Sequence, residues 1–312
     1  MKPLNFVSIF TALFCLLAAQ ETFEGLASAF KDDSSANLPR VHASAAEPQH
    51  ANHMNDDMTA IGETFTVTVK DVGAEKIALD LDDAKVWGKA PKTIATLEKQ
   101  NVVKPTGGGA ITKIQIQAAH NDTVIAFLLQ WEDPIANWER VEKFADAAAV
   151  QFPSDGKGEG SSFMGDEYHM VNIWQWRADR QRDTQLGYQD TRGMNPGLFS
   201  SYTSLDAVDY PAEAVGNPAA LRSPTSPVAA YFARSFGTLT YSQRQDISGI
   251  GEHKNGTWRV IFVRALQTGV EGEPQFQKGV NNFTAFAVWE GSQRERNGMK
   301  SFTKNWVNLI IE

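Results

Sequence analysis

Residues 111–131 read ITKIQIQAAHNDTVIAFLLQW. Apolar and polar residues alternate over residues 111–119, and a second apolar run covers residues 123–131. The turn-forming tripeptide His120-Asn121-Asp122 separates the two runs. A period of two is typical of a β-strand, and Asn and Asp favour tight turns. The stretch therefore predicts two antiparallel strands joined by a short turn.

The same strand pattern recurs along the chain from about residue 61. It is found in TFTVTVK (64–70), VNIWQWR (171–177), TWRVIFVRAL (257–266), FTAFAVWEG (283–291) and NWVNLII (305–311). Helical periodicity is scarce, and its one candidate is WERVEKFADAAA (138–149). Successive strands joined by turns predict a mainly β fold. We expect an antiparallel β-sandwich with a few short helices and long loops, forming one domain over residues 61–312.

The N-terminal region has the composition of a secretory signal peptide. Lys2 precedes an apolar run from Phe6 to Ala19, and small residues follow. We expect a signal over residues 1–29, cleaved after Ala19 or Ala29, with an uncleaved anchor as the alternative. No twin arginine precedes the run, so a Sec-type route to the periplasm is expected, without a stable membrane span after cleavage.

Two further segments lack strand patterns. Residues 30–60 are polar and short of large apolar residues, which predicts a flexible arm. An insertion at about 179–227 contains five prolines. It either covers a ligand or partner, or is a solvated insertion, and its residues do not decide between the two.

Composition excludes several classes of protein. Cys15 is the only cysteine and lies in the expected signal, so the mature chain cannot form disulfides, iron–sulfur clusters or thioether-bound haem. The net charge is −8, and basic residues are interleaved with acidic ones, as in RADRQRD (177–183). Nucleic acid is therefore not an expected partner. The hydrolase motifs G-x-S-x-G and H-E-x-x-H are absent.

A methionine stands in the Gly/Ser-rich sequence SSFMG (161–165). Methionine sulfur is a soft neutral ligand, and it serves as an axial ligand to haem iron. Methionine also fills irregular gaps in hydrophobic cores. The residue alone leaves both roles open for Met164.

Several blocks of sequence resemble one family. They are WEDP (131–134), FADAAAVQFP (144–153), SSFMG (161–165), VNIWQWRAD (171–179) and FAVWEGSQRERNGMKSF (286–302). Together they resemble the haem-binding γ subunits of ethylbenzene dehydrogenase and its relatives, over roughly residues 85–312. The relatives include dehydrogenases of dimethyl sulfide, reductases of selenate, chlorate and nitrate, and nitrite oxidoreductases, all molybdenum enzymes of the dimethyl sulfoxide reductase class.

The resemblance implies one non-covalent b-type haem whose iron is ligated by a methionine and a lysine. The motifs place these ligands at Met164 and Lys300, with Lys278 and His169 as second choices. A lysine binds iron only when neutral, so its pocket must be apolar. The expected walls are Phe163, Phe302, Trp306 and the pair Trp174 and Trp176. Arg177 suits a haem propionate, but the sequence does not select it over Arg234 or Arg264.

The resemblance further implies a non-catalytic electron-transfer subunit of a periplasmic oxidoreductase complex. Its expected partners are a catalytic molybdenum subunit, an iron–sulfur subunit and a soluble c-type cytochrome. Two alternatives remain at this point. An exported carbohydrate-binding β-sandwich without haem would use an aromatic platform built from Trp87, Trp131 or Trp138. A purely structural subunit would keep the fold and bind no haem.

Overall fold

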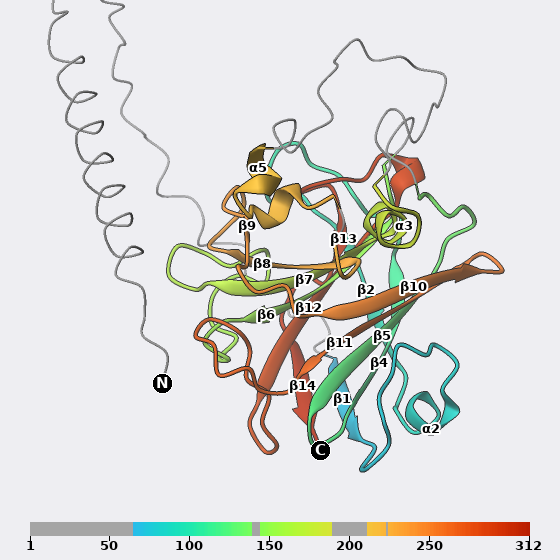
Figure 1. Ribbon diagram of the computed structural model, residues 1–312. Coiled ribbons are helices and arrows are strands. Elements are labelled where there is room, and N and C mark those ends of the chain that lie inside the picture. The colour runs from blue at the N-terminus through green and yellow to red at the C-terminus, as the bar shows by residue number, and fades with distance from the viewer. Residues whose placement is uncertain (1–64, 139–143, 189–210, 223) are drawn as a thin grey trace, which may run out of the picture. The chain divides into compact units, whose positions relative to one another are not determined.

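The computed structural model of this protein describes residues 65–138, 144–188, 211–222 and 224–312 (Figure 1). The expected signal peptide at 1–29 and the expected arm at 30–60 lie outside these residues, as does part of the 179–227 insertion.

Strands dominate the described part of the chain. The two strands expected within residues 111–131 are confirmed as β4 and β5. They pair antiparallel, with Ala119 opposite Ala126. The strands are β1 (Thr66–Asp71), β2 (Thr93–Thr96), β3 (Glu98–Lys99), β4 (Lys113–His120), β5 (Val124–Glu132), β6 (Ala147–Pro153), β7 (Val171–Arg177), β8 (Val228–Ala233), β9 (Thr240–Tyr241), β10 (Ser248–Lys254), β11 (Thr257–Ala265), β12 (Asn282–Trp289), β13 (Ser301–Phe302) and β14 (Val307–Ile311).

The helices are short. They are α2 (Ala84–Trp87), α3 (Ala178–Leu186), α5 (Pro211–Ala214) and the 3-10 helices η2 (Pro218–Ala220) and η3 (Gly291–Gln293). Within the described residues, no helix combines the length and the apolar character needed to cross a bilayer. The expectation of a mainly β fold with a few short helices is confirmed.

One hydrogen-bonded sheet folds over at β12 to give two layers. Residues Asn282–Thr284 of β12 pair with β14, whereas Ala285–Trp289 pair with β6. The strand order is therefore β10-β11-β5-β4-β1-β14 in the first layer and β12-β6-β7-β8-β9 in the second. Side chains from both layers form the main hydrophobic core between them.

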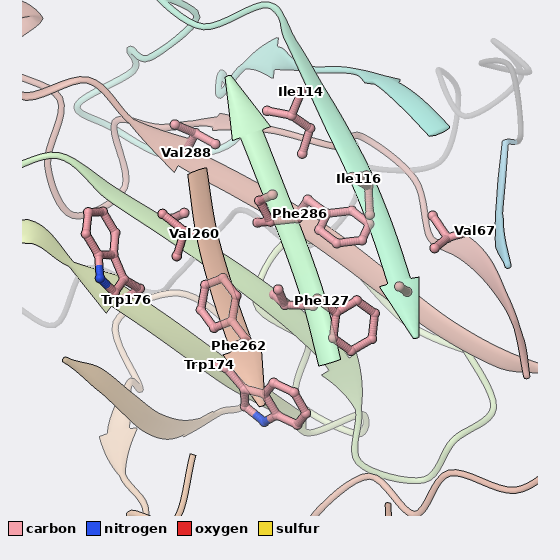
Figure 2. Packing of buried hydrophobic residues seen from close by; sticks show 14 of the residues in the cluster. Val67, Ile114, Ile116, Phe127, Trp174, Trp176, Val260, Phe262, Phe286 and Val288 are labelled. Atoms are coloured by element: carbon pink, nitrogen blue, oxygen red, sulfur yellow. The ribbon is translucent and has the colours of Figure 1, made fainter. Parts of the chain in front are cut away.

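Aromatic residues fill this core. Figure 2 shows Phe127 and Phe262 of the first layer and Trp174 of the second in this core, and the ring centroids of Phe127 and Trp174 lie 6.1 Å apart. Trp176 packs edge-on against Trp258 with centroids 4.9 Å apart. Large apolar side chains on alternate residues of facing strands therefore hold the two layers together.

The sheet is mixed rather than wholly antiparallel. β1 pairs in parallel with both β14 and β4, while the other paired strands run antiparallel. A parallel pair needs a long crossover connection, and residues 72–112 between β1 and β4 provide one. Local alternation predicts that these segments are strands but not which distant strand each one joins.

The prediction of a helix over residues 138–149 is wrong at its C-terminal end. Residues 139–143 are not among the residues that the structure describes. Ala147, Ala148 and Ala149 belong to β6, between β12 and β7. Alanine has the highest helix propensity, but a strand covered on both faces also reads as a continuous apolar run. Pairing on both sides decides the outcome for this segment.

The 179–227 insertion begins with a helix fixed to the sandwich. The side chain of Gln181 in α3 accepts hydrogen bonds from Trp176 Nε1 (2.8 Å) and from the backbone of Gly251 (2.6 Å). Its own Nε2 donates to the Gly251 carbonyl oxygen at 2.7 Å. The start of the insertion is therefore part of the folded domain.

Candidate functional site

A cavity of about 920 Å³ lies against the outer face of the second layer. Side chains on alternate residues of its strands point away from the main core and line the floor. They are Ala147, Ala149 and Gln151 of β6, Ile173, Gln175 and Arg177 of β7, Tyr231 of β8, and Ala285, Ala287 and Trp289 of β12. The volume lies within the range of roughly 300–1,000 Å³ typical of sites for small molecules and cofactors.

Small side chains form the middle of the floor. Ala287 of β12 pairs with Ala149 of β6, which pairs in turn with Gln175 of β7. Because two neighbouring positions carry only a methyl group, the backbone of the sheet is open to a flat ligand there. The alanine run of β6 is thus part of the site.

Met164 lines this cavity from the loop between β6 and β7. Its φ of 62° lies in the left-handed region, which costs a non-glycine residue about 1 kcal/mol or more. The loop holds the conformation through hydrogen bonds. The Ser235 N–H donates to the Met164 carbonyl oxygen at 2.8 Å, and Gln151 Nε2 donates to Ser162 O at 2.8 Å. The surrounding structure therefore fixes Met164 in a conformation that it would not adopt alone.

Lys300 lines the same cavity from the segment that precedes β13. Only 7% of the residue is exposed, and its Nζ lies 4.8 Å from the ring centroid of Phe163 and 5.6 Å from that of Trp289. Among the described residues, Nζ makes no hydrogen bond and no ion pair. Burial lowers the pKa of Lys300 to about 8. Its amine is therefore much more easily deprotonated than that of a surface lysine.

The glycines at 107–109 position the backbone of Lys300. A Cβ on Gly108, whose φ is 89°, would overlap the backbone of Lys300. The Gly109 N–H donates to Ser301 Oγ at 2.9 Å, and the Ala110 N–H donates to Glu295 Oε1 at 2.9 Å. The backbone of the glycine run therefore packs directly against the Lys300 segment.

The second-choice ligands lie elsewhere. His169 is not among the residues that line the cavity, and its Nδ1 is 2.8 Å from Asp166 Oδ1. Lys278 Nζ forms an exposed ion pair with Asp71 at 2.5 Å. The structure therefore brings Met164 and Lys300 together and leaves His169 and Lys278 outside.

The expected walls are confirmed in part. Phe163 and Phe302 line the cavity and pack edge-on with centroids 5.1 Å apart. Trp174 and Trp176 face the main core on the opposite side of β7, so their expected place in the wall is wrong. Trp306 packs near the cavity side but does not line it, and its indole donates to Gly160 O at 3.0 Å.

Two arginines line the cavity. Arg177 is ion-paired with Asp179, and the charge of that carboxylate, working against burial, raises the pKa of Arg177. Arg296, which sequence reasoning missed, stacks on the ring of Phe144 at 4.4 Å. Arg264, the alternative to Arg177, stacks on Trp174 at 4.9 Å on the core side.

Arg234, the remaining alternative, does not line the cavity. Trp289 and Tyr231 were also missed as wall residues. Strand alternation could have placed them on one face, but the sequence does not tell which face carries a cavity.

The tryptophans of the carbohydrate-binding alternative do not form a platform. Trp87 and Trp131 are buried, with 7% and 2% of each residue exposed. Trp138 is partly buried and packs on Trp258 with ring centroids 4.8 Å apart. These three residues serve packing in the structure.

Sequence comparisons with known proteins identify one family. Residues 84–301 match the family described as Ethylbenzene dehydrogenase. The chain is 28% identical over 230 residues to the chlorate reductase subunit gamma of Ideonella dechloratans, covering 72% of this chain and 77% of that protein. It is 23% identical over 261 residues to a putative respiratory nitrate reductase heme subunit of Haloferax mediterranei, covering 81% of this chain and 78% of that protein.

A third relative is the dimethylsulfide dehydrogenase subunit gamma of Rhodovulum sulfidophilum. The identity is 24% over 242 residues, which cover 73% of each chain. These relatives are named as γ or haem subunits of oxidoreductases, as the resemblance of the sequence blocks implied. Because the family match spans well over half of the sequence, this chain belongs to the ethylbenzene dehydrogenase family.

Proposed function

We propose that this protein carries one non-covalent b-type haem in the cavity and passes electrons within a periplasmic molybdenum oxidoreductase complex. Met164 and Lys300 would hold its iron. The observation that carries the proposal is the presence of both side chains in one cavity, with the Lys300 amine buried and unpaired among the described residues.

The chemistry of Lys300 suits this role. At pH 7, releasing the proton of a group with a pKa of about 8 costs on the order of 1 kcal/mol, compared with about 5 kcal/mol at the ordinary value of 10.5. The amine faces the rings of Phe163 and Trp289 rather than a carboxylate. Burial thus makes a lone pair available for iron at a small cost.

The strained backbone of Met164 supports the other side of the site. A left-handed methionine persists only where its surroundings enforce it, and such strain is concentrated at functional sites. A thioether ligand is neutral and favours reduced iron, which raises the potential of a haem.

The remaining groups suit the periphery of a haem. Alanines on the floor leave room for a flat ring, and Phe163, Phe302 and Trp289 give the cavity apolar walls. Arg296, and the part of the Arg177 guanidinium that does not donate to Asp179, offer N–H groups to the two propionates, since a guanidinium matches a carboxylate in charge. A haem bound there would supply a one-electron redox centre; the residues of the chain hold and orient it.

The partners follow from the family and from the composition. A mature chain without cysteine cannot ligate an iron–sulfur cluster, so that cluster and the molybdenum would belong to other subunits. This chain would connect the iron–sulfur subunit to a soluble c-type cytochrome and would not itself be catalytic. Export through the N-terminal signal would place it in the periplasm.

Purification of the tagged full-length chain from its own host tests this function. We expect molybdenum, iron–sulfur clusters and one b-type haem per tagged chain in the same complex. Substrate of that complex should exchange electrons with the haem on the time scale of turnover. Isolation of the chain without haem and without a molybdenum-containing partner would refute the proposal.

A further inference from the structure

Three acidic residues, none of which lines the cavity, meet at the ends of three strands. Asp133 follows β5, Asp146 precedes β6 and Glu290 follows β12. One carboxylate oxygen from each residue can be chosen so that all three lie within 4.8 Å of one another. The exposed fractions of the residues are 0%, 0% and 5%.

The basic side chain beside this cluster is His253, whose Nε2 lies 2.7 Å from the backbone oxygen of Asp133 rather than from its carboxylate. In the described part of the chain, none of the three carboxylates forms an ion pair with a lysine or arginine. The donors to Asp146 are neutral, namely the N–H groups of Asn137 (2.6 Å) and Gly291 (2.8 Å) and the indole of Trp258 (3.0 Å). Burying carboxylates without a cation is costly.

Burial raises the pKa of Asp146 to about 7, and that of Asp133 is raised for the same reason. Both shifts have the direction expected of crowded carboxylates.

Two buried oxygens at the cluster have no hydrogen-bond partner. Asp133 Oδ2 is fully buried and accepts none; the neighbouring indole N–H of Trp131, which lowers the pKa of Asp133, is likewise a buried group without a partner in the described residues. Asn137 Oδ1, on a residue that is 9% exposed, is also unsatisfied. Such atoms are rare in folded proteins, and their coincidence with an acidic cluster indicates that a ligand belongs there.

We propose that Asp133, Asp146 and Glu290 bind one divalent cation, Ca²⁺. The donors are all oxygens, which hard cations prefer. Two oxygens on opposite sides of Ca²⁺ lie about 4.6–5.2 Å apart, so separations within 4.8 Å fit one ion. Each carboxylate has about four lone-pair sites, of which hydrogen bonds within the described residues occupy at most three. Asn137, whose backbone N–H donates to Asp146, carries an unpaired Oδ1 that is a candidate for a fourth ligand.

The cation would fix the ends of strands that form the cavity. Asp146 is adjacent to Ala147 and Glu290 is adjacent to Trp289, and both neighbours line the floor. The Glu290 side chain also accepts hydrogen bonds from Ser292 and Gln293 in η3, at the start of the segment that leads to Lys300. The site is structural, and its occupancy does not require haem.

Metal analysis and thermal unfolding of the purified full-length chain test this proposal. We expect about one Ca²⁺ per chain after gel filtration. Chelator treatment should lower the unfolding midpoint by roughly 5 °C or more, and Ca²⁺ should restore it. No bound Ca²⁺, together with a midpoint that is the same with chelator and with Ca²⁺, would overturn the proposal.

Terbium luminescence localises the ion. Tb³⁺ replaces Ca²⁺ and is excited by energy transfer from a nearby indole, which Trp258 provides through its hydrogen bond to Asp146. The Asp133→Asn variant keeps the size of the side chain and should lose most of the Ca²⁺-competable signal. The Asp122→Asn variant changes an exposed carboxylate and should keep the signal. Equal luminescence in the two variants would place any bound ion elsewhere.

Discussion

Met164 and Lys300 are held in the cavity by different means. The position of Met164 depends on a strained loop conformation fixed by hydrogen bonds, whereas the chemistry of Lys300 depends on burial without a partner. Each state costs free energy in the absence of a ligand. A ligand bound by both groups would offset both of these free-energy costs.

The buried lysine predicts the pH dependence of haem-free stability. The pKa of Lys300 is about 8 in the folded protein and about 10.5 when unfolded, so the unfolded chain binds more protons between these values. The free energy of unfolding should therefore rise with pH between about 8 and 10.5. Below pH 8, Lys300 is protonated in both states, and burial of its charge lowers the free energy of unfolding by roughly 3 kcal/mol.

Denaturant unfolding of the haem-free protein checks this expectation. Lys300→Met should raise stability at pH 7 by up to about 3 kcal/mol and flatten the slope between pH 8 and 10. The matched control Lys278→Met removes an exposed ion pair, so it should change stability by about 1 kcal/mol or less and keep the slope. Equal slopes in the wild type and Lys300→Met would contradict the buried, unpaired state of this amine.

At the scale of single elements, the turn at residues 107–109 supports the segment that carries Lys300. Gly108→Ala would place a methyl group against the Lys300 backbone, and we expect it to lower stability and haem content together. Gly156→Ala is the matched control, because Gly156 also has a positive φ (74°) but meets nothing within 4 Å. The difference in unfolding free energy should be at least about 2 kcal/mol.

Thermal unfolding and haem content, measured for Gly108→Ala and Gly156→Ala, test this prediction. If Gly108→Ala behaved like Gly156→Ala in both measurements, the Lys300 segment would not depend on this close approach.

Strand β6 separates the cavity from the main core. Ala149 faces the cavity, whereas its neighbour Ala148 is buried in the core. Ala149→Leu should therefore lower haem binding more than tenfold with little effect on haem-free stability. Ala148→Leu should destabilise the fold by about 1–3 kcal/mol through overpacking. Haem titration and denaturant unfolding of both variants test the assignment, and a reversed pattern would show that the faces are exchanged.

The strands could be predicted from the sequence more readily than the faces they present. Alternation in VNIWQWR predicts β7 correctly and separates Trp174 and Trp176 from Ile173 and Gln175. It does not say which set contacts the core, because both faces of this layer are covered. The same ambiguity explains why the alanines at 147–149 were expected in a helix.

For the whole molecule, the arrangement of strands depends on pairings between distant segments. β1 and β14 are far apart in the sequence, at Thr66–Asp71 and Val307–Ile311, yet they pair in parallel. β12 joins the two layers. Such pairings leave no local pattern, so the sequence predicts a β-sandwich but not its mixed order. Similarly, Met164 and Lys300 were identified by resemblance to a family, since nothing in their local sequence shows that they share a cavity.

The optical spectrum of the full-length protein, purified from the periplasm of a haem-replete host, tests the central claim most directly. We expect a low-spin b-type haem in the wild type and in the control variants Lys278→Leu and His169→Leu. Met164→Leu and Lys300→Leu should each lose the haem or shift it to high spin. A wild type without haem, or a Lys300→Leu spectrum identical to that of the wild type, would contradict the account.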